Sequence, residues 1–525
     1  MKKAAGIIDA TPSKRLFRSI IADYNLRTGL CELVDNALDQ WNDNKRSHVL
    51  NVNIAVRLDQ QSIRVDDNAG GIAKDALKLL VMPGGATGSG EDETIGLFGV
   101  GSKRAVVALA ERVEIRTRKG AGKTYLLEFD DAWLQEDEWE LPTFEVDAIE
   151  KRSTSIELSK LRFQVDADEL ALLREHLRAT YALFLSDDRF VLTLNGARLT
   201  SMLFDKWTFP PEYCPRRFQG TLKTEDGKEI RLTALAGLSN EQGSIAGEYG
   251  VYFYCNDRLI ARGLKTPEVG FVARLAGAPH NVVSLVRVIV FLNGPADCMP
   301  WNSSKSSIGT SHRTFKVMQT WLQTTLTGFA AVAKRLHGEW PEKVFRFTTG
   351  KIIDVNISDF SEVKRSFLPP LPPKHEKYAV ALQRINQSVL SKKPWARGAV
   401  EADIAVEVIQ KQRLDQKNRL ALILLDSSLE IAFKDFLVNE SGHHYNDAEL
   451  VSLFSARHRV ESEVKKYISI EDHVWSKLKF YYGLRCKLVH ERSSVGIGDS
   501  DIDEFRAIVQ AVLSKLFKVR WVRRA

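Results

Sequence analysis

The fold of the first part of this chain is decided by one stretch, Leu30-Cys-Glu-Leu-Val-Asp-Asn-Ala-Leu-Asp-Gln-Trp41. Its apolar residues recur at helical spacing, which predicts a helix with one buried face. Glu32 and Asn36 are four residues apart, so their side chains lie one above the other on that helix. A carboxylate and a carboxamide at the edge of an apolar stripe are rare unless they are paired or bind a ligand. The same spacing also occurs on solvated helix faces, so its meaning depends on the motifs that follow.

The composition is that of a globular protein with a sizeable core. The chain has 525 residues, of which 44% are hydrophobic and 27% charged, and this length predicts about two to four domains. A formal net charge of +7 permits a polyanionic partner without requiring one. The five cysteines show no C-x-x-C spacing, which indicates neither a disulfide framework nor a zinc site and fits a reducing cytoplasm. Neither a signal peptide nor a membrane-spanning helix is expected.

Two further motifs begin at strand and helix ends. A strand at Ser62–Asp66 leads into Asp67-Asn-Ala-Gly-Gly71, where the glycines let the backbone turn sharply and approach a flat ligand. A carboxylate at this place can accept a hydrogen bond from an exocyclic amine. After a glycine-rich loop at 83–90, the run Ile95-Gly-Leu-Phe-Gly-Val-Gly-Ser-Lys103 opens an apolar helix. Its glycine amides and its lysine together form a cradle for an anion.

These pieces, together with Ser153-Thr-Ser-Ile-Glu-Leu158, resemble the four motifs of the GHKL ATPase family in their family order. That family includes type II topoisomerases, MutL, the heat-shock chaperone and MORC proteins. The resemblance implies an α+β protein whose first domain, residues 1–165, is a Bergerat-type α/β sandwich that binds ATP and Mg²⁺. Ala69 and Ser153 stand where the family usually has glycine, and these departures concern the geometry of the pocket.

The resemblance also implies a role for each motif residue. Glu32 would be the general base that orients the attacking water, and Asn36 would hold the magnesium ion. Asp67 would accept from the adenine amino group, with Gly71 in the pocket wall and Thr154 in support. The phosphate-facing end of the lid would consist of Gly96, Gly99, Gly101 and Lys103. A general base here also makes physical sense, because in-line attack on a phosphoryl group depends mostly on positioning and charge stabilisation.

Residues 166–355 are predicted to form a second α/β domain. A helix at Asp166–Leu185 precedes a β-rich stretch, and another helix begins near Thr314. This order resembles the transducer domain of MutL, gyrase and MORC proteins. The segment Tyr252-Phe-Tyr-Cys-Asn-Asp-Arg-Leu-Ile260 is most similar to the MORC branch. The resemblance implies that Lys305, in a loop after this core, reaches the terminal phosphate and couples nucleotide state to the angle between domains.

The C-terminal part is predicted to be all-α. Leu368-Pro-Pro-Leu-Pro-Pro-Lys374 is a semi-rigid segment within a linker expected at 356–376, and apolar-striped helices fill 377–525. Here the run Leu484-Arg-Cys-Lys-Leu-Val-His-Glu491 resembles the R-x-x-x-x-H motif of the HEPN superfamily, many of whose members cut RNA. The resemblance implies that Arg485 and His490 act in a metal-independent endoribonuclease. Their spacing leaves them on different faces of a regular helix, so a shared phosphate site needs a helix end or a dimer.

The sequence as a whole leads to one expected function and two alternatives. The expectation is a cytoplasmic, MORC-like ATPase that forms a homodimer on binding ATP and Mg²⁺ and controls a HEPN-like RNase in bacterial antiviral defence. The first alternative is an ATP-gated DNA clamp or compaction protein with a non-catalytic C-terminal bundle. The second, a MutL-like repair factor, is disfavoured because no metal-binding cluster is evident in the C-terminal part. A nucleic-acid partner is expected in each case, with RNA or DNA left open.

Overall fold

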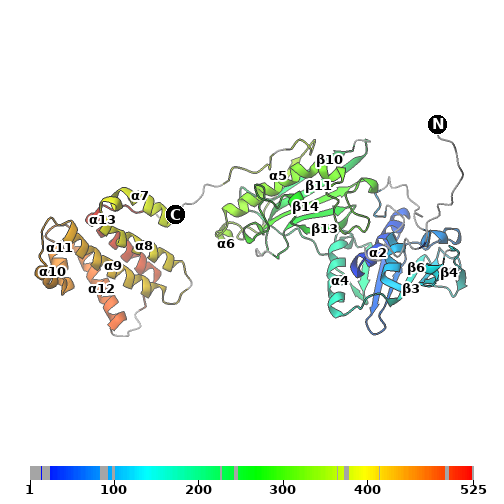
Figure 1. The fold of residues 1–525 in the computed structure, drawn as a ribbon, viewed down its shortest axis with the longest axis horizontal. Helices are drawn as coiled ribbons and strands as arrows, with labels where there is room; N and C mark the ends of the chain where they lie inside the picture. The colour runs from blue at the N-terminus through cyan, green and yellow to red at the C-terminus, as the bar shows by residue number, and fades with distance from the viewer. Residues whose placement is uncertain are drawn as a thin grey trace. The chain divides into compact units, whose positions relative to one another are not determined.

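The structure is a computed structural model that divides into two compact units, Met1–Pro372 and Pro373–Ala525 (Figure 1). The residues that it describes are 14, 24–82, 93–96, 101–136, 138–224, 227–241, 246–363, 365–371, 378–412, 414–490 and 496–522, without the side chains of 101, 102 and 490. The predicted helix start at Thr11-Pro-Ser13 and the glycine-rich loop at 83–90 therefore lie outside the described residues. Within the described ranges no helix combines the length and the apolarity needed to span a bilayer.

The first unit begins with an eight-stranded sheet in the order β5-β4-β3-β6-β2-β1-β7-β8. Its strands are β1 (Leu50–Arg57), β2 (Ser62–Asp67), β3 (Ala110–Arg118), β4 (Thr124–Asp130), β5 (Thr143–Val146), β6 (Ser153–Leu161), β7 (Phe190–Leu194) and β8 (Ala197–Arg198). Neighbouring strands run antiparallel, except that β1 and β7 are parallel. Along β1 fully buried residues alternate with more exposed ones, so one face of the sheet is covered.

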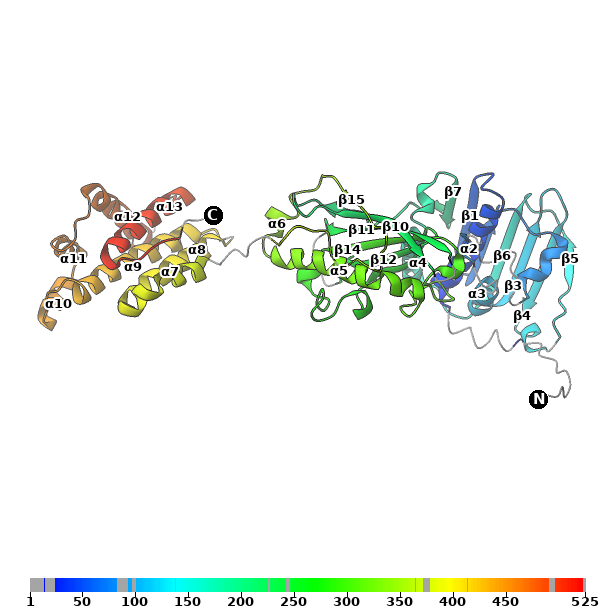
Figure 2. The ribbon, with the colours of Figure 1, turned by 90° about the horizontal axis from the view of Figure 1, so that it is seen from above.

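Two helices cover that face. α2 (Leu26–Asp43) and α3 (Gly101–Leu109) pack on each other and on the sheet, and α4 (Ala167–Thr180) packs against α2 (Figure 2). Leu30, Val34 and Leu38 of α2 are completely buried, which is the single buried face that their spacing predicts. A short 3₁₀ helix at Lys74–Leu80 follows β2. The result is an α/β sandwich, in agreement with the predicted class of the first domain.

The first sheet extends further along the chain than the sequence led us to expect. The expected boundary lay at residue 165, yet β7 and β8 lie beyond it and pair into the same sheet. The physical reason is that a parallel neighbour of β1 can be reached only through a crossover, and α4 is part of that connection. The alternation of residues within β7 indicates a strand, but it does not indicate which strand β7 pairs with.

The second part of the first unit is a seven-stranded sheet in the order β13-β12-β14-β11-β10-β15, with β9 paired to β11. Its strands are β9 (Trp207–Thr208), β10 (Arg216–Lys223), β11 (Glu229–Ser239), β12 (Gly250–Cys255), β13 (Arg258–Leu264), β14 (Val286–Asn293) and β15 (Ile353–Asn356). α5 (Arg313–Arg335) lies along one face of this sheet, and the short α6 (Trp340–Lys343) follows it (Figure 2).

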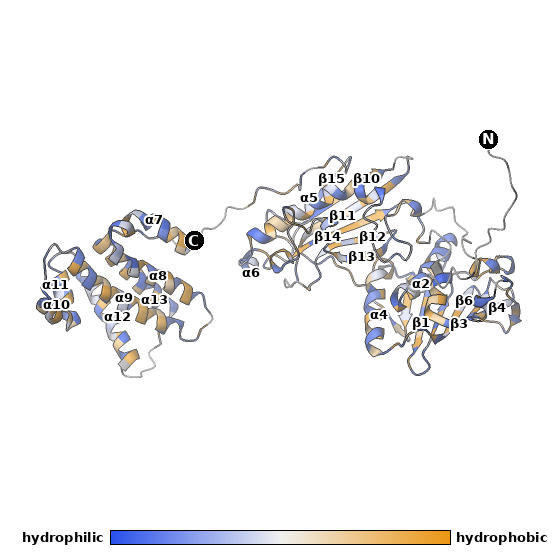
Figure 3. Cartoon of the chain, viewed as in Figure 1, coloured by the Kyte–Doolittle hydropathy of each residue, from blue (hydrophilic) through white to orange (hydrophobic). Residues whose placement is uncertain are grey.

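The central strand β12 is buried on both faces. Val251, Phe253 and Cys255 belong to the large core between the sheet and α5. Tyr252 and Tyr254 point to the other side, into a cluster that includes Ala179 of α4. This explains why the strand is apolar throughout rather than alternating, as the colouring of the central strands shows (Figure 3). The two sheets of the first unit thus share an apolar contact through α4.

Part of the expected linker at 356–376 is packed on the second sheet. Phe360 is completely buried, with its ring centroid 5.0 Å from that of Trp321. The Tyr213 hydroxyl donates a hydrogen bond of 2.8 Å to the carbonyl of Pro370. A proline-rich composition indicates that helices and strands are missing, but it does not exclude packing of side chains. For this reason a segment expected to be a linker is packed on the sheet. Residues 372–377 lie outside the described ranges.

The described residues of the second unit form a helical domain, as predicted. Its helices are α7 (Tyr378–Lys392), α8 (Arg397–Gln410), α9 (Lys417–Asn439), α10 (Asp447–Phe454), α11 (Arg457–Val464), α12 (Asp472–His490) and α13 (Asp499–Phe517). They enclose a core of their own, separate from the two cores of the first unit. A buried ion pair between Arg506 of α13 and Asp403 of α8, 2.6 Å apart, also receives the hydroxyl of Tyr378.

Candidate active site

α2 carries the candidate catalytic residues. Its sequence determines where the helix begins and which of its side chains are buried. Asn25 caps the helix, accepting from the amide of Thr28 at 3.0 Å while its own amide donates to the Thr28 hydroxyl. Glu32 is only 1% exposed and Asp35 is completely buried, whereas Asn36 is exposed. The helix thus presents two buried carboxylates on one side and an accessible carboxamide beside them.

The buried carboxylates are paired with a lysine from the second sheet's part of the unit. Lys305 Nζ lies 2.6 Å from Glu32 Oε2 and 3.2 Å from Asp35 Oδ2. The other oxygen of Glu32, Oε1, is buried and has no hydrogen-bond partner among the described residues. A buried acceptor that the protein leaves unsatisfied is expected to receive a water or ligand donor. The sequence placed both residues at the reacting end of a nucleotide, and the structure brings them into direct contact.

Burial and pairing set the charges of this contact. Burial raises the pKa of Glu32, and the Lys305 ammonium opposes that rise. Burial alone lowers the pKa of Lys305, but the carboxylates of Glu32 and Asp35 outweigh it, so the pKa is raised. The lysine is therefore held as a cation against two carboxylates.

The loop that carries Lys305 is preformed. Lys305 has a φ of +48°, a left-handed conformation that is costly for a residue with a side chain. The Asn302 side chain holds the turn, because its carbonyl oxygen accepts from the amides of Ser306 at 2.8 Å and Ser307 at 3.2 Å. Lys305 N also donates to the carbonyl of Asn302 at 3.0 Å. The strain is therefore overcome by local hydrogen bonds that fix the direction of the lysine.

The end of β2 forms the candidate adenine site. Asp67 lies opposite Thr154 in the β2–β6 register, and its carboxylate accepts from the amide of Ala69 at 2.9 Å. The Thr154 hydroxyl is 3.1 Å from that of Thr117, which in turn accepts from the amide of Ile72 at 2.9 Å. Burial raises the pKa of Asp67 to about 7, against the lowering effect of the Ala69 amide. The predicted residues Asp67 and Thr154 are thus brought together on adjacent strands.

Gly71 is required by a close approach of the backbone. Its φ is +68°, and a Cβ at this position would lie 2.1 Å from the carbonyl oxygen of Arg118. The same turn is held by α2, because Gln40 donates to the carbonyl of Gly71 at 2.8 Å and Asn44 to that of Ala69 at 2.9 Å. Sequence reasoning missed these two amides. Two hydrogen bonds therefore join the turn to α2.

Asp39 of α2 anchors the start of the third motif. Its two carboxylate oxygens accept from the amides of Ile95 at 2.8 Å and Gly96 at 2.6 Å. Burial raises the pKa of Asp39 to about 7, and these two amides oppose the rise. Sequence reasoning missed this residue too, although its spacing from Glu32 and Asn36, seven and three residues, is a helical signal. Gly99 lies outside the described residues, and Gly101 is the first residue of α3.

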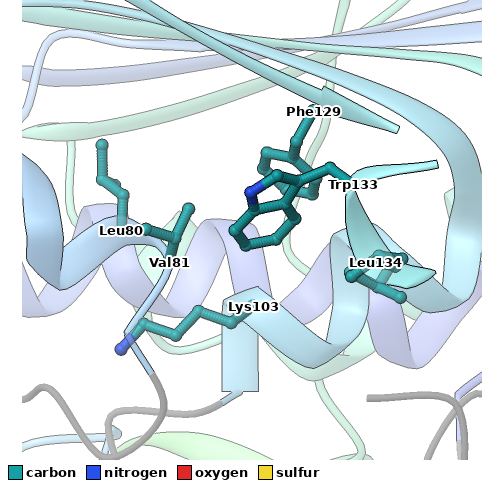
Figure 4. A pocket seen from close by; sticks show the side chains of 7 residues that line it. Leu80, Val81, Lys103, Phe129, Trp133 and Leu134 are labelled. Atoms are coloured by element: carbon teal, nitrogen blue, oxygen red, sulfur yellow. The ribbon is translucent and has the colours of Figure 1, made fainter. Parts of the chain in front are cut away.

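Lys103 is buried at the other end of the same motif. It lines a cavity of about 10 Å³ together with apolar side chains: Leu80, Val81, Val107, Phe129, Trp133 and Leu134. In Figure 4 its side chain runs below Val81, with the ammonium end away from Leu134. Burial lowers its pKa to about 8. The structure thus places Lys103 at the start of α3 but does not itself show it beside Asp67 or Glu32.

The donor set around Asn36 fits Mg²⁺. This ion usually takes one or two protein oxygens and fills its octahedron with phosphate oxygens and water. The exposed carboxamide of Asn36, next to the buried Glu32, offers one such oxygen. The ion would supply charge neutralisation at the phosphates when bound. Among the described residues, no group of three or more His, Cys, Asp or Glu forms a ready-made metal cluster.

The first part of the chain is an α/β sandwich in which a buried carboxylate, Glu32, contacts a lysine, Lys305. Residues 24–161 match the family described as histidine kinase-, DNA gyrase B- and HSP90-like ATPase, so this part of the chain is similar to GHKL-type ATPase domains. No curated protein matches the chain. The matched range ends with β6 and therefore includes neither β7 nor Lys305.

Of the two candidate side chains of the second unit, the structure describes Arg485. Arg485 lies within α12, its Nε 3.7 Å from Asp426 Oδ2 of α9, and Asp426 also pairs with Arg457 at 2.7 Å. Burial raises the pKa of Asp426, and Arg457 opposes the rise. His490 is the last residue of α12, and its side chain lies outside the described residues. Arg485 therefore has a carboxylate neighbour inside the bundle itself.

Proposed function

We propose that this protein is an ATP-driven switch in which a MORC-like GHKL ATPase controls a HEPN-like helical unit. The observation that carries the proposal is the contact between Lys305 and Glu32, 2.6 Å, which joins the second sheet's part of the unit to the catalytic helix. A nucleotide that attracts Lys305 to its terminal phosphate must draw it away from Glu32. Binding of ATP therefore changes the contact between the two parts of the first unit.

α2 supports nucleotide binding along its whole length. Its first half carries Glu32, and its second half holds the turn at Gly71 through Gln40. The two positions are eight residues apart, about 12 Å along the helix axis. An extended nucleotide that places adenine at Asp67 lies along α2, with its terminal phosphate near Glu32 and Mg²⁺ at Asn36.

Hydrolysis then follows from the residues present. The oxygen of a water molecule attacks the terminal phosphorus, and Glu32 takes a proton from that water. The bond between the terminal phosphorus and the bridging oxygen, which leaves with ADP, breaks. Lys305 stabilises the charge that develops on the phosphoryl oxygens. The products are ADP and phosphate, and the proton on Glu32 returns to solvent. Lys305 is then free to pair with Glu32 again.

The activity of the second unit has two candidates. The first is an endoribonuclease, used in antiviral defence, in which Arg485 stabilises a phosphate and His490 moves protons. The second is an ATP-gated DNA clamp with a non-catalytic bundle, and the pairing of Arg485 with buried Asp426 favours it. Both candidates require a homodimer that nucleotide binding forms or tightens.

One set of measurements tests the switch. We expect a slowly hydrolysed ATP analogue with Mg²⁺ to increase the mass measured by light scattering from monomer toward dimer, or to tighten an existing dimer. RNA cleavage that responds to the nucleotide and disappears in His490→Ala supports the RNase. DNA binding that rises on dimerisation and survives His490→Ala supports the clamp. An unchanged mass and shape with and without nucleotide would overturn the switch.

A further inference from the structure

The turn between β12 and β13 belongs neither to the four family motifs nor to the lysine loop, yet its side chains contact both. Asn256 and Asp257 form its tip, with φ values of +47° and +65°, which is the geometry of a two-residue type I′ turn. Short polar residues such as Asn and Asp tolerate this conformation. The turn conformation explains why Asn and Asp occur at the tip. It does not explain why Asn256 and Arg258 contact Thr94 and Asp35 in the first domain.

Arg258, which follows this tip, is built into the catalytic network. It is 2% exposed, and its Nε lies 2.9 Å from Asp35 Oδ1 on α2. Its Nη1 donates to the backbone carbonyl of Lys305 at 2.7 Å. Tyr181 also donates to Asp35, at 2.7 Å. One guanidinium thus contacts both α2, through the carboxylate of Asp35, and the lysine loop, through the backbone carbonyl of Lys305. The planar donors of arginine are suited to binding two acceptors.

Asn256 reaches the third motif. Its Nδ2 donates to the carbonyl of Thr94 at 3.0 Å, and Thr94 directly precedes the two residues whose amides Asp39 of α2 accepts. The same side chain is fixed to its own sheet, because it exchanges hydrogen bonds of 3.0 Å with both the amide and the carbonyl of Gly294. Residues 93–96 are therefore held between α2 on one side and the β12–β13 turn on the other.

We propose that Asn256 and Arg258 are positioning residues that hold residues 93–96, α2 and the lysine loop in one arrangement. One turn contacts α2 through Asp35, residues 93–96 through the carbonyl of Thr94 and the lysine loop through the carbonyl of Lys305. The turn therefore fixes the position of Lys305 relative to α2 and to residues 93–96, and its loss misplaces the lysine for its contact with the terminal phosphate. The proposal rests on the ATPase function proposed above.

Two glycine substitutions in the same turn test the contact to Thr94. Asn256→Gly keeps the left-handed turn and removes the side chain that reaches Thr94. Asp257→Gly is the matched control, because it makes the same change one position later, where the side chain only accepts from Asn293 at 3.2 Å. We expect Asn256→Gly to lower kcat by roughly tenfold or more with ADP affinity nearly unchanged, and Asp257→Gly to stay near wild type. Equal kcat in both variants would overturn the proposal.

Arg258 needs a paired design because its loss removes one of the two cations of buried Asp35, leaving only Lys305 at 3.2 Å, and can unfold the protein. The double variant Arg258→Gln with Asp35→Asn removes both charges, and Asp35→Asn alone is its reference because it also loses the carboxylate 3.2 Å from Lys305 Nζ. We expect the double variant to recover the thermal stability that Arg258→Gln loses while kcat stays below that of Asp35→Asn and ADP still binds. Recovery of kcat together with stability would show a structural role alone and overturn the proposal. A wild-type protein without ATP turnover would instead remove the proposed function on which the inference rests.

Discussion

Glu32 illustrates how much one buried carboxylate can depend on its neighbour. It needs to be ionised and to face water in order to act as a base, yet it is buried with one oxygen on Lys305 and the other without a partner among the described residues. We expect Glu32→Gln to bind ATP with nearly the wild-type affinity and to hydrolyse it about 10²–10⁴-fold more slowly, because only the proton acceptor is lost. Isothermal titration and phosphate release measure the two quantities. Turnover near wild type would exclude Glu32 as the base.

The pH dependence of turnover follows from the same pair. Burial raises the pKa of Glu32, and Lys305 partly offsets this rise. Because only the ionised carboxylate accepts a proton, kcat/KM, which reports the free enzyme in which the pair exists, should fall as the pH is lowered through this raised pKa. Lys305→Ala removes the offsetting cation, so its acidic limb should lie at higher pH than that of wild type, in addition to its lower kcat. Lys305→Arg, which keeps the positive charge, serves as the control. An acidic limb that does not move in Lys305→Ala would contradict the pairing.

Asp67 is proposed to act in nucleotide binding rather than in turnover. Asp67→Asn removes the anionic acceptor proposed for the adenine amine, a charged hydrogen bond of about 1.5–3 kcal/mol. ATP and ADP affinity should both fall by about tenfold or more, as measured by titration calorimetry. Asp66→Asn is a matched control on the preceding residue, whose carboxylate instead pairs with Arg64 at 2.8 Å. Equal affinity in the two variants would place adenine elsewhere.

The residues of the site differ in how far the sequence could predict them. Glu32 and Asp67 could be predicted because their motifs are local, and Asp39 could have been found from its helical spacing. Arg258 could not, because its partner Asp35 is 223 residues away in the chain. An arginine after an Asn-Asp turn is an ordinary surface residue unless another domain buries it. Contacts across domains depend on packing that no local pattern contains.

At the scale of the element, the turn after β2 shows a position where only glycine fits. Gly71→Ala combines a positive φ with a Cβ 2.1 Å from the carbonyl oxygen of Arg118, so we expect a loss of stability of about 1–3 kcal/mol or more and loss of ATP binding. Gly120→Ala is the matched control: its φ is +56° and no atom lies within 4 Å of the added Cβ. It should cost only about 1 kcal/mol and leave binding intact. Thermal unfolding and ATP titration of both variants check this, and equal effects would contradict the steric argument.

The elements themselves were largely predictable, but their partners were not. The sequence predicts a β-rich stretch in the second domain, and β12 is one of its strands. That both of its faces are buried follows from α5 on one side and α4 on the other, helices that come from distant parts of the chain. Likewise the sequence predicts that Phe360 lies in a linker, whereas in the fold it packs against Trp321. Periodicity specifies an element and its exposed face, while the partner of a buried face is decided by the fold.

At the scale of the whole molecule, the two units have separate hydrophobic cores and should unfold separately. A ligand that binds only the first unit should stabilise only that unit, by about 2.7 kcal/mol at a hundredfold excess over its dissociation constant. We therefore expect calorimetry with a slowly hydrolysed ATP analogue to raise one transition and leave the other in place. The fragment 373–525 should melt at the temperature of the unmoved transition. A single transition that moves as a whole would show that the units are energetically coupled.

The parallel pairing of β7 with β1 also affects how the protein is made. β1 is an outer strand until Phe190–Leu194 has left the ribosome, although the rest of its sheet is complete once β6 has been synthesised. At roughly 5–20 residues per second this delay lasts a few seconds. During that time the nascent chain exposes an unpaired strand edge, which is a site of aggregation and of chaperone binding. Truncation after the matched ATPase region would make this transient edge permanent, so expression of the domain should extend at least through β8.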